Sequence, residues 1–197
     1  MKKIIFLCLI LFPNKGLIGS VNNNPFEYFS LSIELLKNVN NNDLHYFYQP
    51  QNGLKTSITT PFYWGDIQAS VQILPFFGLE KDYIDFIGIH PNIKCGKSIH
   101  IFEKLRWYNA IGAGYYIFYF SKPLYLSHEI INPGIAESEL SAGYFSELQY
   151  SFNNKINLNI ETNIDRIFTY KHIDMINISM GISYLFKTPD WMILLLN

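Results

Sequence analysis

The chain has 197 residues and a formal net charge of -1, so it is long enough for one domain with a core, and it lacks the basic excess of a nucleic-acid-binding protein. Charged residues make up 16% of the chain, below the ~25% usual for soluble domains, whereas aromatic residues reach 17%. These values indicate that part of the surface contacts something other than water.

The first 20 residues have the layout of a secretory signal peptide. Two lysines precede an apolar run over residues 4–12, and small residues follow up to Ser20. Pro13 ends the run well short of the ~20 apolar residues that a spanning helix needs. We therefore expect export, with cleavage near Ser20 and a mature domain over residues 21–187. A buried N-terminal strand or an uncleaved anchor is the alternative.

The cysteine content limits how the mature chain is stabilised. Cys8 lies within the apolar N-terminal run, so Cys95 is the only cysteine left after cleavage. A single cysteine allows no internal disulfide. Burial and backbone pairing must then stabilise the fold, and Cys95 is expected to be a passive residue.

Eight segments alternate between apolar and polar residues with the period of two that is typical of β-strands. They span residues 26–36, 52–62, 65–77, 84–102, 106–120, 134–152, 156–168 and 176–186. In the last of them, Ile178 and Met180 alternate with Asn177 and Ser179. Pro91 predicts a bulge or an interruption in the fourth. No segment after the N-terminus has the ~18 continuous apolar residues of a membrane-spanning helix, so the pattern predicts an all-β protein.

The connections between these segments alternate in length. Tight turns follow the second, fourth and sixth segments, at residues 63–66, 103–104 and 153–155, with the Gly and Asn chemistry that turns favour. Longer links over residues 38–51 and 121–133 follow the first and fifth segments. All longer links therefore fall at one end of the meander. This arrangement is typical of an eight-stranded antiparallel up-and-down transmembrane β-barrel with short periplasmic turns and longer external loops.

The polar face of the strands favours a membrane barrel over a soluble, lipocalin-like binder, which would also alternate. The polar face of a soluble barrel meets water and is usually rich in Lys and Glu, whereas here it carries mainly Ser, Thr, Asn, Gln and Gly. Eight strands enclose a space that side chains just fill, and Gly112 and Gly143 would leave room for longer side chains opposite. The apolar face should meet lipid, with Trp107, Tyr184 and other aromatic residues near strand ends forming interfacial girdles.

Charged residues of both signs fall on the face that is expected to point inward. Because buried charges must be paired and hydrogen-bonded, we expect an internal network of ion pairs that plugs the lumen. Its members are Glu34, Lys55, Asp66, Lys94, Arg106, Glu137, Glu139, Glu147, Glu161 and Asp165. His90 and His100 share this face, but ten residues of strand separate them by ~33 Å, so we expect two hydrogen-bonded lumen residues and no metal site.

The signal peptide, the eight alternating strands and a final strand ending in GISYLF resemble the small outer-membrane β-barrels of the OmpA-like and OmpX-like group. The resemblance covers nearly the whole mature chain. It implies a place in the bacterial outer membrane, contact with membrane lipid and lipopolysaccharide, and recognition of the closing strand by the barrel-insertion machinery. Phe186 is followed by KTPDWMILLLN, which departs from the family pattern, and residues 188–197 are expected to form a short interfacial or periplasmic tail.

The strong catalytic motifs are missing from the sequence. It contains no Gly-rich phosphate loop, CxxC pair, HExxH or GxSxG, so we expect no cofactor and no catalysis. The segment LSHEIINPG resembles the lipid A deacylases only faintly, because that family has a serine two residues after the histidine and this chain has Ile130 there. A hydrolase that acts on lipid A through His128 is therefore an alternative, as is a narrow channel through the charged lumen.

The first long link carries the candidate external contact residues, which are His45, Tyr46, Phe47 and Tyr48. Exposed aromatic side chains often mark contact sites. We therefore expect a structural or surface-interaction role, with a monomer favoured and with no nucleic-acid partner.

Overall fold

The structure, a computed structural model, describes residues 25–120, 124–126, 129–132, 136–189 and 191. The expected signal peptide lies outside these residues, as do His128 and most of the expected C-terminal tail. Among the described residues, no helix is long and apolar enough to cross a membrane.

The eight long strands coincide with the eight predicted segments, with boundaries that differ by only a few residues. They are β1 (Tyr28–Asn38), β3 (Gly53–Phe62), β4 (Gly65–Gly78), β5 (Phe86–Phe102), β6 (Leu105–Phe120), β9 (Ala136–Ser151), β10 (Ile156–Ile167) and β11 (Ile173–Lys187). The remaining elements lie in the two long links and are short: the 3-10 helix η1 (Asp43–Tyr46) and the strands β2 (Tyr48–Pro50), β7 (Leu124–Leu126) and β8 (Glu129–Asn132).

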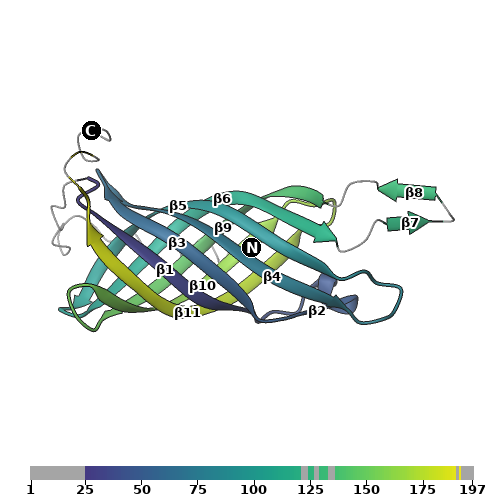
Figure 1. The fold of residues 1–197 in the computed structure, drawn as a ribbon, viewed down its shortest axis with the longest axis horizontal. Coiled ribbons are helices and arrows are strands. Elements are labelled where there is room, and N and C mark those ends of the chain that lie inside the picture. Colours follow the sequence, from purple (N-terminus) through teal and green to yellow (C-terminus); the bar gives the residue numbers. More distant parts are fainter. Residues whose placement is uncertain (1–24, 121–123, 127–128, 133–135, 190, 192–197) are drawn as a thin grey trace, which may run out of the picture.

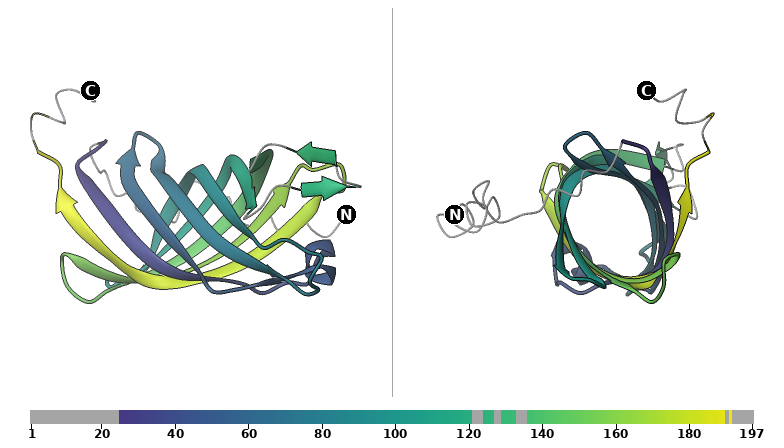
Figure 2. Two further views of the ribbon diagram at one scale, coloured as in Figure 1. Left: turned by 45° about the vertical axis from the view of Figure 1, so that its right-hand side comes forward. Right: turned by 90° about the vertical axis from the view of Figure 1, so that its left-hand side faces the viewer.

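The eight long strands form a closed ring. Each pairs in antiparallel fashion with its neighbours in the order β4-β3-β1-β11-β10-β9-β6-β5, and β5 pairs with β4 in turn. Figure 1 shows the tilted strands from the side, and the right-hand view of Figure 2 shows the ring around its lumen. The predicted all-β antiparallel barrel is therefore confirmed.

The first and last strands close the barrel as an antiparallel pair. Phe29 pairs with Phe186 and Leu35 pairs with Met180, with continuous pairing between them. The rings of Phe29 and Phe186 stack with centroids 5.8 Å apart. Closure satisfies the backbone groups of both edge strands, which a bilayer requires.

The register shift in β5 lies away from Pro91. Pro91 remains in register with Val71 of β4, and the register with β6 is the same on both sides of it. The register shift falls between His100 and Phe102, next to the turn. Of the two predicted possibilities, the bulge is absent at Pro91, whereas the pairing with β6 is interrupted there, between the pairs Ile89–Ile117 and Asn92–Gly114. Proline lacks one ladder donor, and β5 has its extra residue where the chain reverses.

The two faces of the barrel wall have opposite chemistry. The outward-facing side chains are large, apolar and exposed, such as Ile111 at 71%. The inward-facing side chains include many buried polar groups, such as Ser70, Asn92 and Asn159. A soluble lipocalin-like barrel would bury its apolar face, so the structure contradicts that alternative.

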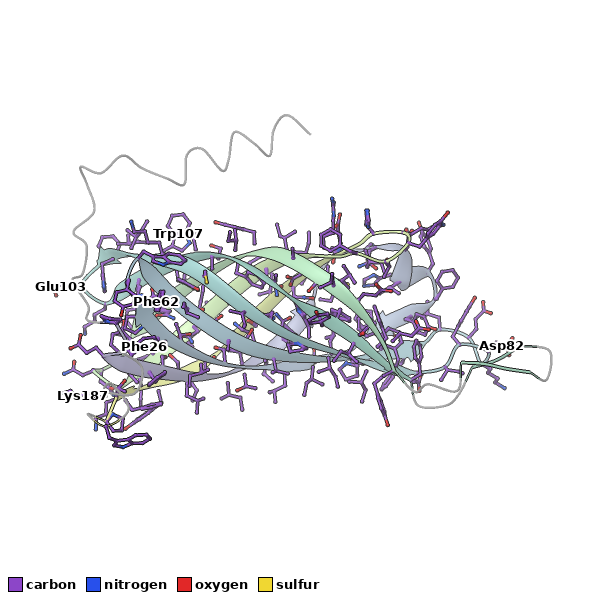
Figure 3. The ribbon with its side chains drawn as sticks, turned by 90° about the horizontal axis from the view of Figure 1, so that it is seen from above. Phe26, Phe62, Asp82, Glu103, Trp107 and Lys187 are labelled. Atoms are coloured by element: carbon purple, nitrogen blue, oxygen red, sulfur yellow. The ribbon has the colours of Figure 1, made fainter. Side chains whose placement is uncertain are left out.

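We call the end of the barrel with the tight turns the turn end, and the opposite end the loop end. Glu103 and Lys187 lie at the turn end, whereas Asp82 lies at the loop end (Figure 3). The hairpin of β7 and β8 extends beyond the loop end (Figure 1).

Candidate functional site: the lumen and its rims

Four buried charged residues join opposite walls at the centre of the lumen. Lys55 Nζ lies 3.0 and 2.9 Å from the two carboxylate oxygens of Glu34, and 2.8 Å from Glu161 Oε2. Lys94 Nζ lies 2.9 Å from the same Glu161 oxygen. Strands β1, β3, β5 and β10 supply these residues. We call this set the central charge group.

Neutral polar side chains complete the hydrogen bonding of the central carboxylates. Glu34 accepts hydrogen bonds from Ser32 at 2.9 Å and from Ser179 at 2.5 Å. Glu147 accepts one from Gln149 at 2.8 Å and a longer one of 3.4 Å from Gln68. The sequence did not single out these serines and glutamines, although they lie on the inward-facing parity. Gln149 and Gln68 each satisfy one oxygen of the buried Glu147 carboxylate, whereas Lys55 already contacts both oxygens of Glu34.

Small and aromatic residues shape the space around the central charge group. Lys94 Nζ lies 4.0 Å from the centroid of the Phe145 ring, which is a cation–π contact. A Cβ added at Gly112 would lie 3.0 Å from Lys94 Cγ, and one added at Gly143 would meet Asp165 Oδ1. The side chain of Lys94 therefore occupies the volume that a larger residue at position 112 would need.

A second ion pair lies nearer the turn end. Arg106 Nη2 lies 2.6 Å from Asp66 Oδ2, and Arg106 Nη1 donates to the Tyr28 hydroxyl at 3.2 Å. Ser98 donates to the same Asp66 oxygen at 2.5 Å. A hollow of about 580 Å³ opens beside this pair, with His100 among its lining residues.

Three residues expected inside the lumen lie elsewhere. Glu137 is exposed and Glu139 is half-buried, and both lie at the start of β9, where the strand rises beyond the end of β10. His100 is exposed at the turn end. Alternation gives the side of the wall on which a residue lies, but it does not give the height at which the lumen ends.

His90, Ser141 and Asp165 form a third buried group. The His90 ring nitrogen Nε2 lies 2.7 Å from Ser141 Oγ, and Nδ1 lies 3.9 Å from Asp165 Oδ2. This order is that of a catalytic triad, but 3.9 Å is too long for a hydrogen bond. All three side chains are buried, and none of them lines the hollow beside Arg106. The group is thus a packed polar layer of the lumen.

An apolar cluster fills the lumen at the loop end. Its buried members are Leu36, Leu74, Phe76, Phe86, Tyr116, Phe118, Ile167 and Met175. We call this set the apolar plug. Leu44 of η1 and Tyr48 of β2 pack against it, so the first long link folds back over the barrel mouth. The sequence analysis missed the plug, although its residues continue the inward parity of each strand towards the loop end.

The candidate external residues divide into two pairs. Tyr46 and Phe47 are exposed, at 78% and 44%. Tyr48 is half-buried, with its ring centroid 4.9 Å from that of Phe86. His45 forms the capping box of η1 with Asn42, and the Asn42 N–H donates to His45 Nδ1 at 3.2 Å. Of these four candidates, only Tyr46 and Phe47 therefore present exposed aromatic surface at the rim.

The rim of the barrel at the loop end carries more acidic than basic side chains. Among its described residues, the acidic side chains are Asp43, Glu80, Asp82, Asp85, Glu137, Glu139 and Asp174, and the basic ones are Lys37, Lys81, Arg166 and Lys171. No group of three or more His, Cys, Asp or Glu residues in the described chain could hold a metal ion.

Solved structures with the same arrangement of strands identify the fold. The outer membrane protein OprG from Pseudomonas aeruginosa aligns with a TM-score of 0.54 and 11% identity, over 84% of this chain and 99% of that chain. Neisserial surface protein A aligns with a TM-score of 0.53 and 10% identity, over 82% and 96%. This chain has the fold of the small outer-membrane β-barrels.

A third similar structure is Ail, the attachment invasion locus protein of Yersinia pestis, in complex with the heparin analogue sucrose octasulfate. Its TM-score is 0.51 and its identity is 17%, over 81% of this chain and 97% of that chain. No protein-family model and no curated protein sequence matches this chain. The likeness therefore concerns the fold, and the predicted resemblance to the small outer-membrane barrels is confirmed at that level.

Proposed function

We propose that this chain is an exported protein of the bacterial outer membrane whose lumen is closed and which acts through its outer rim, as a structural or surface-interaction protein. The observation that carries the proposal is the filling of the lumen. The central charge group joins opposite walls with fully buried side chains, and the apolar plug lies between it and the loop end. An aqueous path would have to cross both layers.

The exposed aromatic side chains of the rim supply the proposed contact surface. Tyr46 and Phe47 project from the loop end, and Tyr170 is fully exposed after β10. The structure of Ail holds a sulfated ligand, but acidic residues outnumber basic ones at this rim. The charge balance therefore favours a partner that contacts aromatic surface over a sulfated polyanion.

Planar bilayer recordings test the closed lumen. The folded protein should give no steady conductance, whereas a continuous aqueous path would give stepwise single-channel currents at neutral pH. Folding is checked by the heat-dependent shift in gel mobility of each preparation, with the heat-unfolded chain as the blank. Steady currents from the folded protein would contradict the proposal.

Thiol labelling tests which end of the barrel faces outward. In a Cys95→Ser background, Tyr46→Cys should react with a membrane-impermeant maleimide on intact cells. Tyr63→Cys is the matched control, because Tyr63 is 67% exposed in a turn at the opposite end. It should react only after lysis. The reverse pattern would overturn the proposed orientation.

Adherence tests the proposed contact surface. Cells that express Tyr46→Ser/Phe47→Ser should adhere several-fold less to cultured epithelial cells than cells with the wild-type protein. Tyr63→Ser/Trp64→Ser, the exposed aromatic pair at the turn end, should adhere like the wild type. Equal adherence of all three strains would remove the contact role and leave the structural one.

A further inference from the structure

Four polar side chains form one row across the otherwise apolar outer wall. Lys97 of β5 pairs with Asn109 of β6, Asn109 pairs with Ser146 of β9, and Ser146 pairs with Thr162 of β10. We call these four residues the polar row. Because paired residues in antiparallel strands lie on the same face, a row of this kind is one continuous feature of the surface.

The polar row lies on the outward-facing parity of its strands. Lys97 and Thr162 are exposed, and Asn109 and Ser146 are half-buried. Towards the loop end, the next outward-facing residue after Asn109 on β6 is Ile111, and the next after Thr162 on β10 is Ile164. Both are large and exposed. The row therefore interrupts the lipid-facing band on four adjacent strands.

The protein's own donors already occupy two acceptors of the row. Trp107 Nε1 donates to Ser146 Oγ at 2.8 Å, and the Tyr144 hydroxyl donates to Asn109 Oδ1 at 2.6 Å. Within the described part of the chain, the Lys97 ammonium and the Asn109 amide nitrogen have no hydrogen-bond partner. The free groups of the row thus include two nitrogen donors, one of them positively charged, and these suit an anionic acceptor.

The depth of the row places these donors near one membrane interface. Trp107 lies towards the same end as Glu103 and Lys187 (Figure 3), and Asn109 is two residues further along β6. Ile99 of β5 pairs with Trp107, and Lys97 lies two residues from Ile99 towards the loop end, or roughly 5 Å deeper than the tryptophan for a strand tilted by ~40°. The flexible stem of lysine can carry its ammonium several ångströms further towards the interface.

We propose that the polar row binds the phosphate of an anionic phospholipid in the leaflet at the turn end. The Lys97 ammonium pairs with a phosphate oxygen, and the Asn109 Nδ2 group donates a second hydrogen bond. A phosphate would also neutralise a charge that is otherwise unfavourable on a lipid-facing wall. The inference rests on the membrane placement given under the proposed function, but on neither the closed lumen nor the rim contacts.

Native mass spectrometry of the protein released from nanodiscs tests the site. The discs contain phosphatidylcholine mixed with phosphatidylglycerol, and the measurement is the number of phosphatidylglycerol molecules retained per chain. Lys97→Gln should retain about fivefold less phosphatidylglycerol than the wild type. Asn109→Asp should do the same, because it keeps the acceptor for Tyr144 and replaces the amide donor with a negative charge.

Lys155→Gln is the matched control. Lys155 is another exposed lysine at the turn end, outside the row, and its replacement should leave retention unchanged. Unchanged retention in Lys97→Gln, or an equal loss in Lys155→Gln, would overturn the proposal. A change in the fraction of chain dimers with retention unchanged would also overturn it, since the row would then be an interface between two copies.

The heat-dependent gel shift confirms that each variant is folded before release. A chain that does not enter nanodiscs at all would refute the membrane placement itself. Failure of the phosphate site is thereby distinguished from failure of the proposed function.

Discussion

Lys94 Nζ lies 2.9 Å from Glu161 Oε2, although the two residues belong to β5 and β10, which are not neighbours in the ring. Their side chains are 0% and 1% exposed. The ion pair therefore crosses the lumen and ties together walls that share no backbone hydrogen bonds. A sheet closed only by its ladders would lack this constraint on its cross-section.

Removing Lys94 should destabilise the barrel strongly. In Lys94→Met, Glu161 keeps only Lys55 as a charged partner, and loss of one member of a buried ion pair costs about 3–5 kcal/mol. The measurement is the free energy of unfolding in urea, followed by tryptophan fluorescence in lipid vesicles. Arg166→Ala, which removes an ion pair with Asp174 whose side chains are both about half exposed, should cost less than about 1 kcal/mol. Equal losses of unfolding free energy in the two variants would show that the Lys94–Glu161 pair stabilises the barrel no more than an exposed ion pair does.

Gly143→Ala should destabilise the fold through overpacking. The new Cβ would meet Asp165 Oδ1 and lie 2.7 Å from the carbonyl oxygen of Ile164, and such overpacking costs about 1–3 kcal/mol. The temperature of the heat-dependent gel shift should fall accordingly. Ala142→Val is the control, because Ala142 is exposed on the outer wall and its extra methyl groups meet no lumen side chain. A lower shift temperature in the control alone would contradict this account.

The order of η1 should depend on pH. Burial of the His45 ring lowers its pKa below the ordinary 6.5, so the folded link favours the neutral ring, whose Nδ1 accepts from the Asn42 N–H. This contribution to stability is complete above the ordinary pKa and is lost as the pH falls through 6.5 towards the lowered value. Amide hydrogen exchange over residues 42–46, corrected for intrinsic rates, should thus be faster at pH 5 than at pH 8.

The control for this prediction is His45→Gln. Glutamine at the third helical position also completes a capping box and does not titrate. Exchange in His45→Gln should therefore show little pH dependence after the same correction. An undiminished pH effect in this variant would place the titrating group elsewhere.

The register of the closing seam should be measurable by cross-linking. Ile33 of β1 pairs with Ile182 of β11, and paired residues in antiparallel strands lie about 4.5–5.5 Å apart. In a Cys95→Ser background, Ile33→Cys with Ile182→Cys should form a disulfide in most folded chains. Ile33→Cys with Ile178→Cys, displaced by four residues or about 13 Å of strand, should form almost none. Efficient cross-linking of the displaced pair would indicate a different register.

Much of the fold follows from local chemistry, and for that reason it could be predicted. Alternation in each segment locates the strands and the side of the wall that each residue occupies, as Ile178 and Ser179 illustrate. The tight turns indicate that consecutive strands are neighbours, and they identify the end of the barrel that has the short connections. The bulge near His100 escaped prediction, because a register shift depends on how two strands meet at a turn, and neither strand records it alone.

The functional residues were predictable only in part. The parity argument gave Lys55, Lys94 and Glu161 as inward-facing residues, but it gave Glu139 equally, and that residue lies where β9 rises past β10. Strand tilt and stagger decide how high a residue sits in the barrel, and they depend on all eight strands together. The polar row also escaped prediction, because its four members lie far apart in sequence and only the pairing of their strands aligns them.

The sequence by itself determined the period of two and which face of each strand is apolar. It therefore indicated an all-β barrel with its apolar side outward, because these properties depend on neighbouring residues. Only the tertiary structure decided which charges meet across the lumen, where the apolar plug begins and which polar residues align on the outer wall. Those relationships join residues on different strands, and the closed ring alone fixes their relative heights.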